Sequence, residues 1–158
     1  MSSQADQLET IGLMAAHEAA MADFYSAYAA RFPDSAHLFT SLATAERDHA
    51  RRIADFTGGV RAGTVRIKPG RFPYAALLNS LELVREQVSE AQKPELTLVK
   101  ALSVAHDLES GLIESRYFEV VEGDSPELRS LLQLLAEEIE EHRALLQEAW
   151  EKERQRSP

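Results

Sequence analysis

The chain has 158 residues, 44% of them hydrophobic, and a formal net charge of -9. This length suffices for one substantial core, so we expect residues 1–158 to form a single domain. The negative charge disfavours a nucleic-acid binder or a binder of anionic membranes, because either would need a basic surface. The absence of cysteine excludes disulfides, thiolate catalysis, and cysteine-ligated zinc or iron–sulfur centres. Any bound metal must therefore use nitrogen and oxygen ligands.

Glycine and proline are scarce and gather between segments rich in Ala, Leu, Glu and Arg, which is the composition of long helices. We therefore predict an all-α fold. No apolar run reaches the roughly 20 residues of a membrane span. The N-terminus lacks the basic and apolar regions of a signal peptide, so we expect a cytoplasmic protein.

The first helix is predicted from Gln4 to Arg31, because Pro33 disfavours a helical conformation at the residue before it. Glu18 takes a core position in its apolar stripe, two helical turns before Tyr25. The alternative is that Glu18 lies at the edge of the stripe and reaches solvent. The stripe consists of Leu8, Ile11, Ala15, Glu18, Ala22, Tyr25 and Ala29.

The second helix is predicted from an N-cap at Asp34–Ser35 to about Thr57, ending at Gly58–Gly59. The short loop before it makes the first two helices an antiparallel hairpin. Glu46 and His49 are three residues apart, so both side chains leave the same face and can reach one ion. They interrupt an apolar stripe, where an unpaired carboxylate costs several kcal/mol, so a metal ion is the expected partner. That stripe consists of Phe39, Leu42, Glu46, His49, Ile53 and Phe56.

Residues 58–73 have no helical period and are predicted to be a crossover loop. A strand at Thr64–Ile67 would lack an evident partner. The segment from Tyr74 to about Ala91 has one apolar face and is predicted to be a shorter connecting helix.

A third long helix is predicted from about Pro94 to Glu122, with Glu109 at the centre of its stripe. The stripe consists of Leu98, Leu102, Ala105, Glu109 and Leu112. The last helix is predicted from an N-cap at Ser125 to about Lys152. Its stripe consists of Leu128, Leu131, Leu135, His142, Leu145 and Ala149.

The two halves of the chain form a weak internal repeat. Ala16–Tyr25 recurs as Ala105–Phe118, and Leu42–Ile53 recurs as Leu135–Leu146. Each half brings carboxylates and one histidine to its inner face, which is how a metal site at the centre of a four-helix bundle is built. With Glu18 seven residues before Tyr25 and then Glu46-x-x-His49, the sequence resembles the ferritin-like superfamily and, within it, the rubrerythrin-like branch.

The resemblance implies an antiparallel four-helix bundle with a long crossover that contains a short extra helix. It also implies a carboxylate-bridged dinuclear iron site that reacts with dioxygen or peroxide. The matching ligand positions are Glu18, Glu46, His49, Glu109 and His142.

The second half departs from the family pattern. Ile139 stands three residues before His142, where a full site would have glutamate. Glu138 lies on nearly the same face and either reaches inward as a further ligand or is one of several solvated acids. An asymmetric or single-metal site is therefore an open alternative.

The leading hypothesis is a metal protein holding one or two iron ions, with manganese and zinc as alternatives. If active, it would be an oxidoreductase of ferroxidase or peroxidase type, acting on dioxygen or peroxide with an external electron donor. Tyr25 would donate a hydrogen bond to a ligand or quench a radical. The alternative is a degenerate bundle without catalysis, serving as a scaffold or interaction module. We expect a homodimer formed through helix faces, and interfacial packing for His17 and His106.

Overall fold

The computed structural model describes residues 3–68, 74–111 and 120–156. These ranges are mostly α-helical, and the predicted all-α class is confirmed. The elements are α1 (Gln4–Arg31), the 3-10 turn η1 (Pro33–Ser35), α2 (Ala36–Ala62), β1 (Arg66–Ile67), α3 (Tyr74–Glu90), α4 (Leu98–Glu109), β2 (Val121–Glu122) and α6 (Pro126–Arg156).

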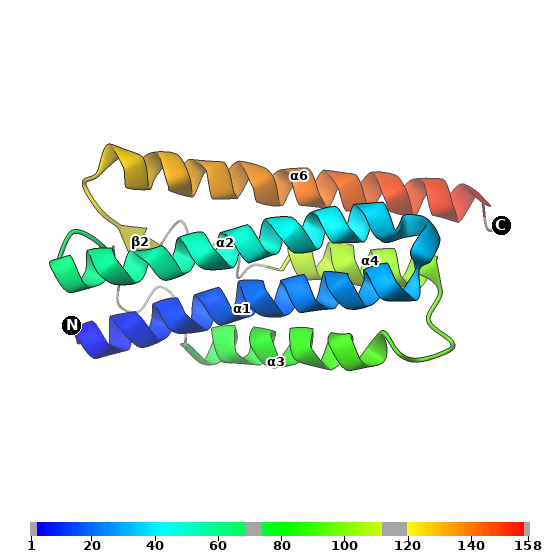
Figure 1. Cartoon of the computed structure of the whole chain (residues 1–158), viewed down its shortest axis with the longest axis horizontal. Coiled ribbons are helices and arrows are strands. Elements are labelled where there is room, and N and C mark those ends of the chain that lie inside the picture. Colours follow the sequence, from blue (N-terminus) through cyan, green and yellow to red (C-terminus); the bar gives the residue numbers. More distant parts are fainter. Residues whose placement is uncertain (1–2, 69–73, 112–119, 157–158) are drawn as a thin grey trace.

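The helices lie side by side along one long axis (Figure 1). α1 and α2 form an antiparallel pair, α3 packs against α1, and α4 packs against α6. The sequence colours show that α1, α3 and α6 run in one direction and that α2 and α4 run in the other. α3 thus carries the chain along the length of the molecule, from the end of α2 toward the start of α4.

α1 has the bounds that the sequence predicts. Its first turn is fixed by a capping box, in which the Ser3 hydroxyl accepts from the Asp6 backbone N–H and the Asp6 carboxylate accepts from the Ser3 N–H. The helix ends at Arg31, and its C-cap Phe32 lies directly before Pro33. Within the described part of the chain, no helix has the length and apolarity of a membrane span.

α2 does not end at Gly58–Gly59 as predicted, but continues to Ala62 and stops at Gly63, which has a φ of 76°. Gly59 instead allows the chain to fold back closely, because a Cβ there would lie 2.4 Å from Val65 Cγ2. At the other end, Ser35 occupies the N-cap position as predicted, although its side chain makes no capping hydrogen bond.

β1 has a partner that the sequence did not reveal. It pairs antiparallel with β2, with Arg66 opposite Glu122 and Ile67 opposite Val121. The prediction of one helix from Pro94 to Glu122 is therefore wrong at both ends. α4 begins after a Thr97 N-cap, and Val121–Glu122 is strand. Residues 112–119 of that predicted helix lie outside the described residues.

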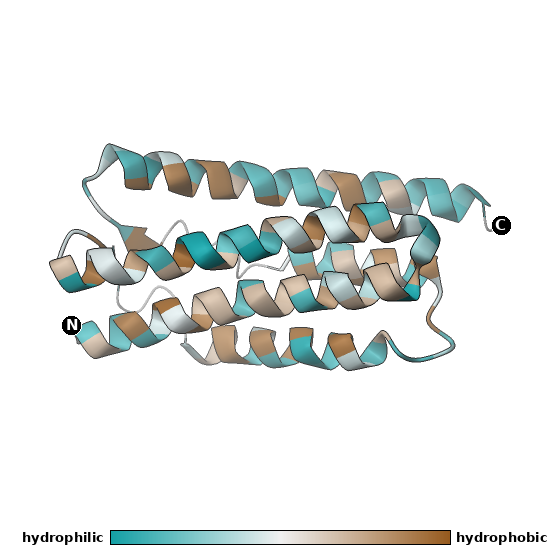
Figure 2. Ribbon diagram, viewed as in Figure 1, coloured by the Kyte–Doolittle hydropathy of each residue, from teal (hydrophilic) through white to brown (hydrophobic). Residues whose placement is uncertain are grey.

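The buried apolar side chains form two clusters with a polar layer between them. One cluster includes Phe24, Tyr28 and Phe39, and the other includes Ile11 and Ile53. Figure 2 shows the hydrophilic colour near the middle of α2 and α6, between more hydrophobic stretches. The polar layer therefore crosses the molecule at mid-length.

The buried face of α6 differs in part from the predicted stripe. Leu146 is fully buried, whereas Leu145, which was predicted to be in the stripe, is 46% exposed. Ile139 is also buried. The inward face of α6 consists of Leu128, Leu135, Ile139, His142 and Leu146.

Candidate metal centre

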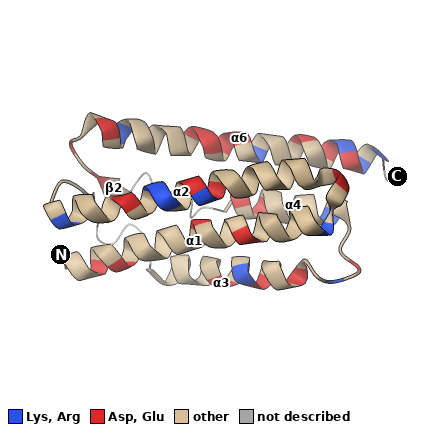
Figure 3. Ribbon diagram, in the orientation of Figure 1, with Lys and Arg blue, Asp and Glu red and all other residues tan. Residues whose placement is uncertain are grey.

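Five of the predicted ligands meet in the polar layer, and each is at most 6% exposed. α1, α2, α4 and α6 all contribute, and Figure 3 shows acidic segments at mid-length on these helices. The helical spacing places each side chain between apolar neighbours on its own helix, which is why it points inward. The five residues are Glu18, Glu46, His49, Glu109 and His142.

Glu46 lies at the centre and uses its two carboxylate oxygens differently. Its Oε2 lies 3.1 Å from His49 Nδ1, and its Oε1 lies 3.0 Å from His142 Nδ1. Glu18 Oε2 lies 3.8 Å from His49 Nδ1, and Glu109 Oε1 lies 3.5 Å from His142 Nδ1. The two imidazole rings are stacked, with their centroids 5.6 Å apart.

These residues form two groups of ligand atoms that share Glu46. The His49 set consists of Glu18, Glu46 and His49, and the His142 set consists of Glu46, Glu109 and His142. In each set, one ligand atom per residue lies within 4.8 Å of the others. The geometry thus offers two adjacent cation positions with Glu46 between them.

Tyr25 and Glu138, which the sequence also singled out, each contact one member of these sets. Tyr25 donates from its Oη to Glu109 Oε1 at 2.6 Å. Glu138 Oε2 lies 2.6 Å from His49 Nε2, the ring nitrogen opposite the one that faces Glu46. Glu138 belongs to neither set. The inward position beside it on α6 is filled by Ile139.

Burial and the charge of Glu109 raise the pKa of Glu46 to about 8. Burial alone would lower the pKa of His49, but its contacts with Glu18 and Glu46 raise that pKa to about 11. Burial acts on His142 in the same way, and Glu109 and Glu46 raise its pKa to about 10. Burial would raise the pKa of Glu18, but His17 and His49 hold it well below the ordinary value. Without a cation, protons on these groups balance the buried negative charge.

The donor set fits a divalent metal. Glu18 Oε1 and Glu109 Oε2 are buried, and neither finds a hydrogen-bond partner in the described part of the structure. Each set therefore contains one buried carboxylate oxygen that accepts no hydrogen bond from the described residues. A buried oxygen of this kind normally contacts an ion or a water molecule. Carboxylate and imidazole donors suit iron, manganese and zinc.

The sequence did not indicate two of the contacts around the centre. His17 is 2% exposed and its Nε2 lies 2.8 Å from the Ser80 Oγ on α3, which agrees with the interfacial packing expected for it. The contact between Glu138 and His49 joins α6 to α2. Neither partner could be found from helical periodicity, because each lies on a helix distant in sequence.

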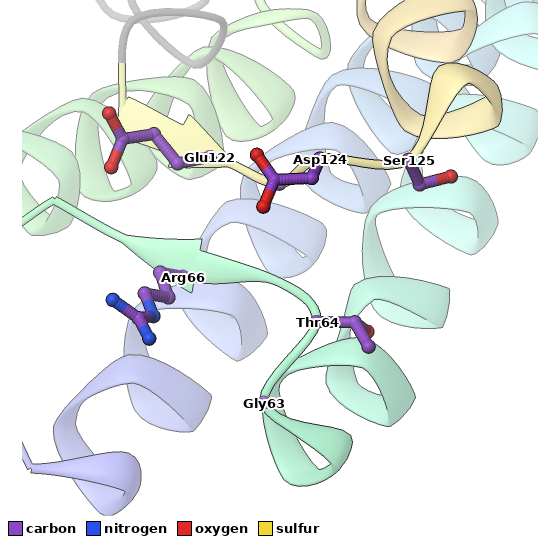
Figure 4. Close-up of a pocket in the computed structure, with 7 residues that line it drawn as sticks. Gly63, Thr64, Arg66, Glu122, Asp124 and Ser125 are labelled. Atoms are coloured by element: carbon purple, nitrogen blue, oxygen red, sulfur yellow. The ribbon is translucent and has the colours of Figure 1, made fainter.

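A surface pocket lies away from the centre, at the end of the molecule where β1 and β2 pair. It has a volume of about 640 Å³, and its walls include Thr64, Arg66, Glu122 and Asp124 (Figure 4). None of the candidate ligands lines this pocket. The buried ion-binding geometry therefore belongs to the helix interior, not to this surface hollow.

One comparison with known proteins supports the part of the site that the first half of the chain contributes. A family model described as Rubrerythrin matches residues 14–106, which is more than half of the chain. The matched region contains Glu18, Glu46 and His49. Comparisons with curated proteins and with solved structures gave no match.

Proposed function

Because the chain belongs to the rubrerythrin family of the ferritin-like superfamily, we propose that it binds one or two iron ions at the centre defined by the two sets. The observation that carries this proposal is the position of Glu46, whose two oxygens face the histidines of different sets. Iron is the expected metal, and manganese and zinc suit the same donors.

In this proposal, residues 1–158 form one ferritin-like domain. α1, α2, α4 and α6 are the four helices of an antiparallel bundle, and α3 is the extra helix within its crossover. The antiparallel direction of α1 and α2, and the common direction of α1 and α6, support this topology. One ligand-bearing face from each of the four helices then meets at the bundle axis.

When bound, iron would supply redox chemistry toward dioxygen or peroxide, as in a ferroxidase or a peroxidase. The residues of the chain would bind the iron and shield it from water. Glu46 would bridge, His49 and His142 would fix the geometry, and the apolar clusters on both sides would exclude water. Tyr25 holds a hydrogen bond on Glu109 and is placed to supply a proton or to quench a radical. Electrons would come from a separate donor, since the sequence has no cysteine for an iron–sulfur or rubredoxin-type centre.

A second candidate is a bundle that serves as a scaffold without metal. It is favoured by Ile139, which replaces an expected ligand, and by the pairing of Glu46 with both histidines without a cation. In this alternative, protonated histidines would neutralise the carboxylates permanently. Chelators would then leave the stability of the protein unchanged.

Metal content and thermal stability together distinguish these candidates. We expect protein reconstituted anaerobically with Fe(II) to retain up to two ions per chain, and Glu46→Ala to abolish retention. A chelator should lower the melting temperature of the loaded wild type, because binding to the folded state alone stabilises it. Glu141→Ala is the matched control, because Glu141 is exposed on α6 and its removal causes the same change in charge. Equal iron content in wild type and Glu46→Ala, with no effect of chelator, would overturn the metal assignment in favour of the scaffold.

A further inference from the structure

The two ligand sets have the same number of ligands but different surroundings. His49 is held at both ring nitrogens, with Nδ1 facing Glu46 and Nε2 lying 2.6 Å from Glu138 Oε2. His142 contacts Glu46 and Glu109 through Nδ1, and no described carboxylate reaches its other nitrogen. Among the described residues, only the His49 set therefore has a carboxylate that contacts the outer nitrogen of its histidine.

A carboxylate behind a ligating histidine strengthens metal binding in two ways. It accepts the proton of the outer nitrogen, which leaves the lone pair of the inner nitrogen directed at the ion, and it raises the basicity of the ring. Loss of such a partner typically costs 10–100-fold in metal affinity. Glu138 would have this effect on His49 Nδ1.

The surroundings of Glu109 act in the opposite direction on the His142 set. Tyr25 donates a hydrogen bond to Glu109 Oε1 at 2.6 Å, which stabilises the free carboxylate and makes it a weaker ligand. Glu18 in the His49 set also has polar neighbours, the imidazole nitrogens of His17 at 3.6 Å and of His49 at 3.8 Å. The difference between the two sets therefore rests mainly on the contact of Glu138 with His49.

Ile139 leaves α6 without the glutamate that could add a ligand to the His142 set. It occupies the inward position one turn before His142 and is 6% exposed. Glu138, the adjacent acid, is directed to His49 and belongs to neither set. The one carboxylate that α6 brings to the centre therefore supports the opposite metal position.

We infer that the centre consists of two unequal metal positions, that the His49 set fills first, and that Glu138 is a positioning residue that creates this order. This inference rests on the proposed function, because it requires that the sets bind metal. It assigns the His142 set as the weaker, exchangeable position.

The test is a titration of the metal-free full chain with Co²⁺, followed by visible absorption under anaerobic conditions. We expect two steps separated by at least about tenfold in affinity. Glu18→Gln should remove the tight step, because Glu18 belongs only to the His49 set, and Glu109→Gln should remove the weak step. Glu138→Gln should weaken the tight step about 10–100-fold and leave the weak step unchanged.

Two controls separate positioning from a general structural effect. Glu141→Gln makes the same charge change at an exposed site on α6 and should leave both steps unchanged. In the Zn²⁺-loaded wild type, imidazole ¹⁵N NMR should show His49 protonated at Nε2, and Glu138→Gln should speed the exchange of that proton with water. Circular dichroism verifies that each variant is folded.

Two steps of equal affinity, or a Glu138→Gln variant that weakens both steps equally or neither, would overturn the inference while leaving the proposed function intact. A wild-type chain that binds no Co²⁺ would instead overturn the proposed function itself.

Discussion

Glu46 connects the two halves of the candidate centre. Each of its oxygens is within hydrogen-bond distance of one histidine, whereas Glu18 and Glu109 each belong to one set. A carboxylate with this burial would be costly if ionised alone, so a proton or a cation must accompany it. Protonation of the centre would therefore compete with the proposed metal binding.

The metal-free protein should lose stability as the pH rises above about 5. The folded-state pKa values of Glu46, His49 and His142 are about 8, 11 and 10, and all lie above their ordinary values of 4.5, 6.5 and 6.5. A group with a raised pKa contributes stability that is present below the unfolded pKa and is lost as the pH rises through the folded pKa. Glu18, with its lowered pKa, changes stability only in the acidic range.

We predict that urea unfolding in the presence of chelator gives a free energy that falls by at least about 1 kcal/mol between pH 5.5 and pH 8.5. Glu46→Gln should show a smaller fall, because its contribution is removed. A free energy that rises over this range would contradict the assigned protonation.

Ile139→Glu should restore the second Glu-x-x-His pattern on α6. Because position 139 is buried, the new carboxyl group should destabilise the metal-free protein. Metal should then raise the melting temperature of Ile139→Glu more than that of the wild type, because the ion would bind the added buried carboxylate. Ile139→Val, which should cost about 0.5–1.5 kcal/mol with no change in the response to metal, is the control. An equal response to metal in Ile139→Glu and wild type would contradict the placement of position 139 at the centre.

At the scale of the elements, two adjacent glycines of α2 should respond to substitution in opposite ways. A Cβ at Gly59 would lie 2.4 Å from Val65 Cγ2, so Gly59→Ala should destabilise the protein by about 1–3 kcal/mol. Gly58 has nothing within 4 Å of the same position, so Gly58→Ala should stabilise the helix by about 0.5–1 kcal/mol. Chemical denaturation of both variants measures the difference, and equal effects would contradict the close return of the chain after α2.

Helical periodicity was sufficient to predict α1 and to single out Glu18, Glu46 and His49, because a charged group in an apolar stripe is visible in the sequence. It failed at Gly58–Gly59, where glycine serves tertiary packing and not helix termination. It also failed at β1 and β2, because strand pairing between distant segments leaves no local signal. The role of Glu138 was undetermined for the same reason, since its partner lies on another helix.

At the scale of the whole molecule, the centre divides the hydrophobic interior in two. Each apolar cluster draws side chains from several helices, and the polar layer joins α1, α2, α4 and α6 between them. A cation in this layer would contact helices from both halves of the chain. Metal binding is therefore expected to stabilise the entire fold and not one hairpin alone.

Anomalous scattering tests the central claim most directly. Crystals of the protein loaded anaerobically with Fe(II) would be measured on both sides of the iron absorption edge. We predict anomalous difference peaks inside the polar layer, one among Glu18, Glu46 and His49 and a second among Glu46, Glu109 and His142. The absence of any peak among these residues, with Glu46 still paired directly to both histidines, would contradict the account.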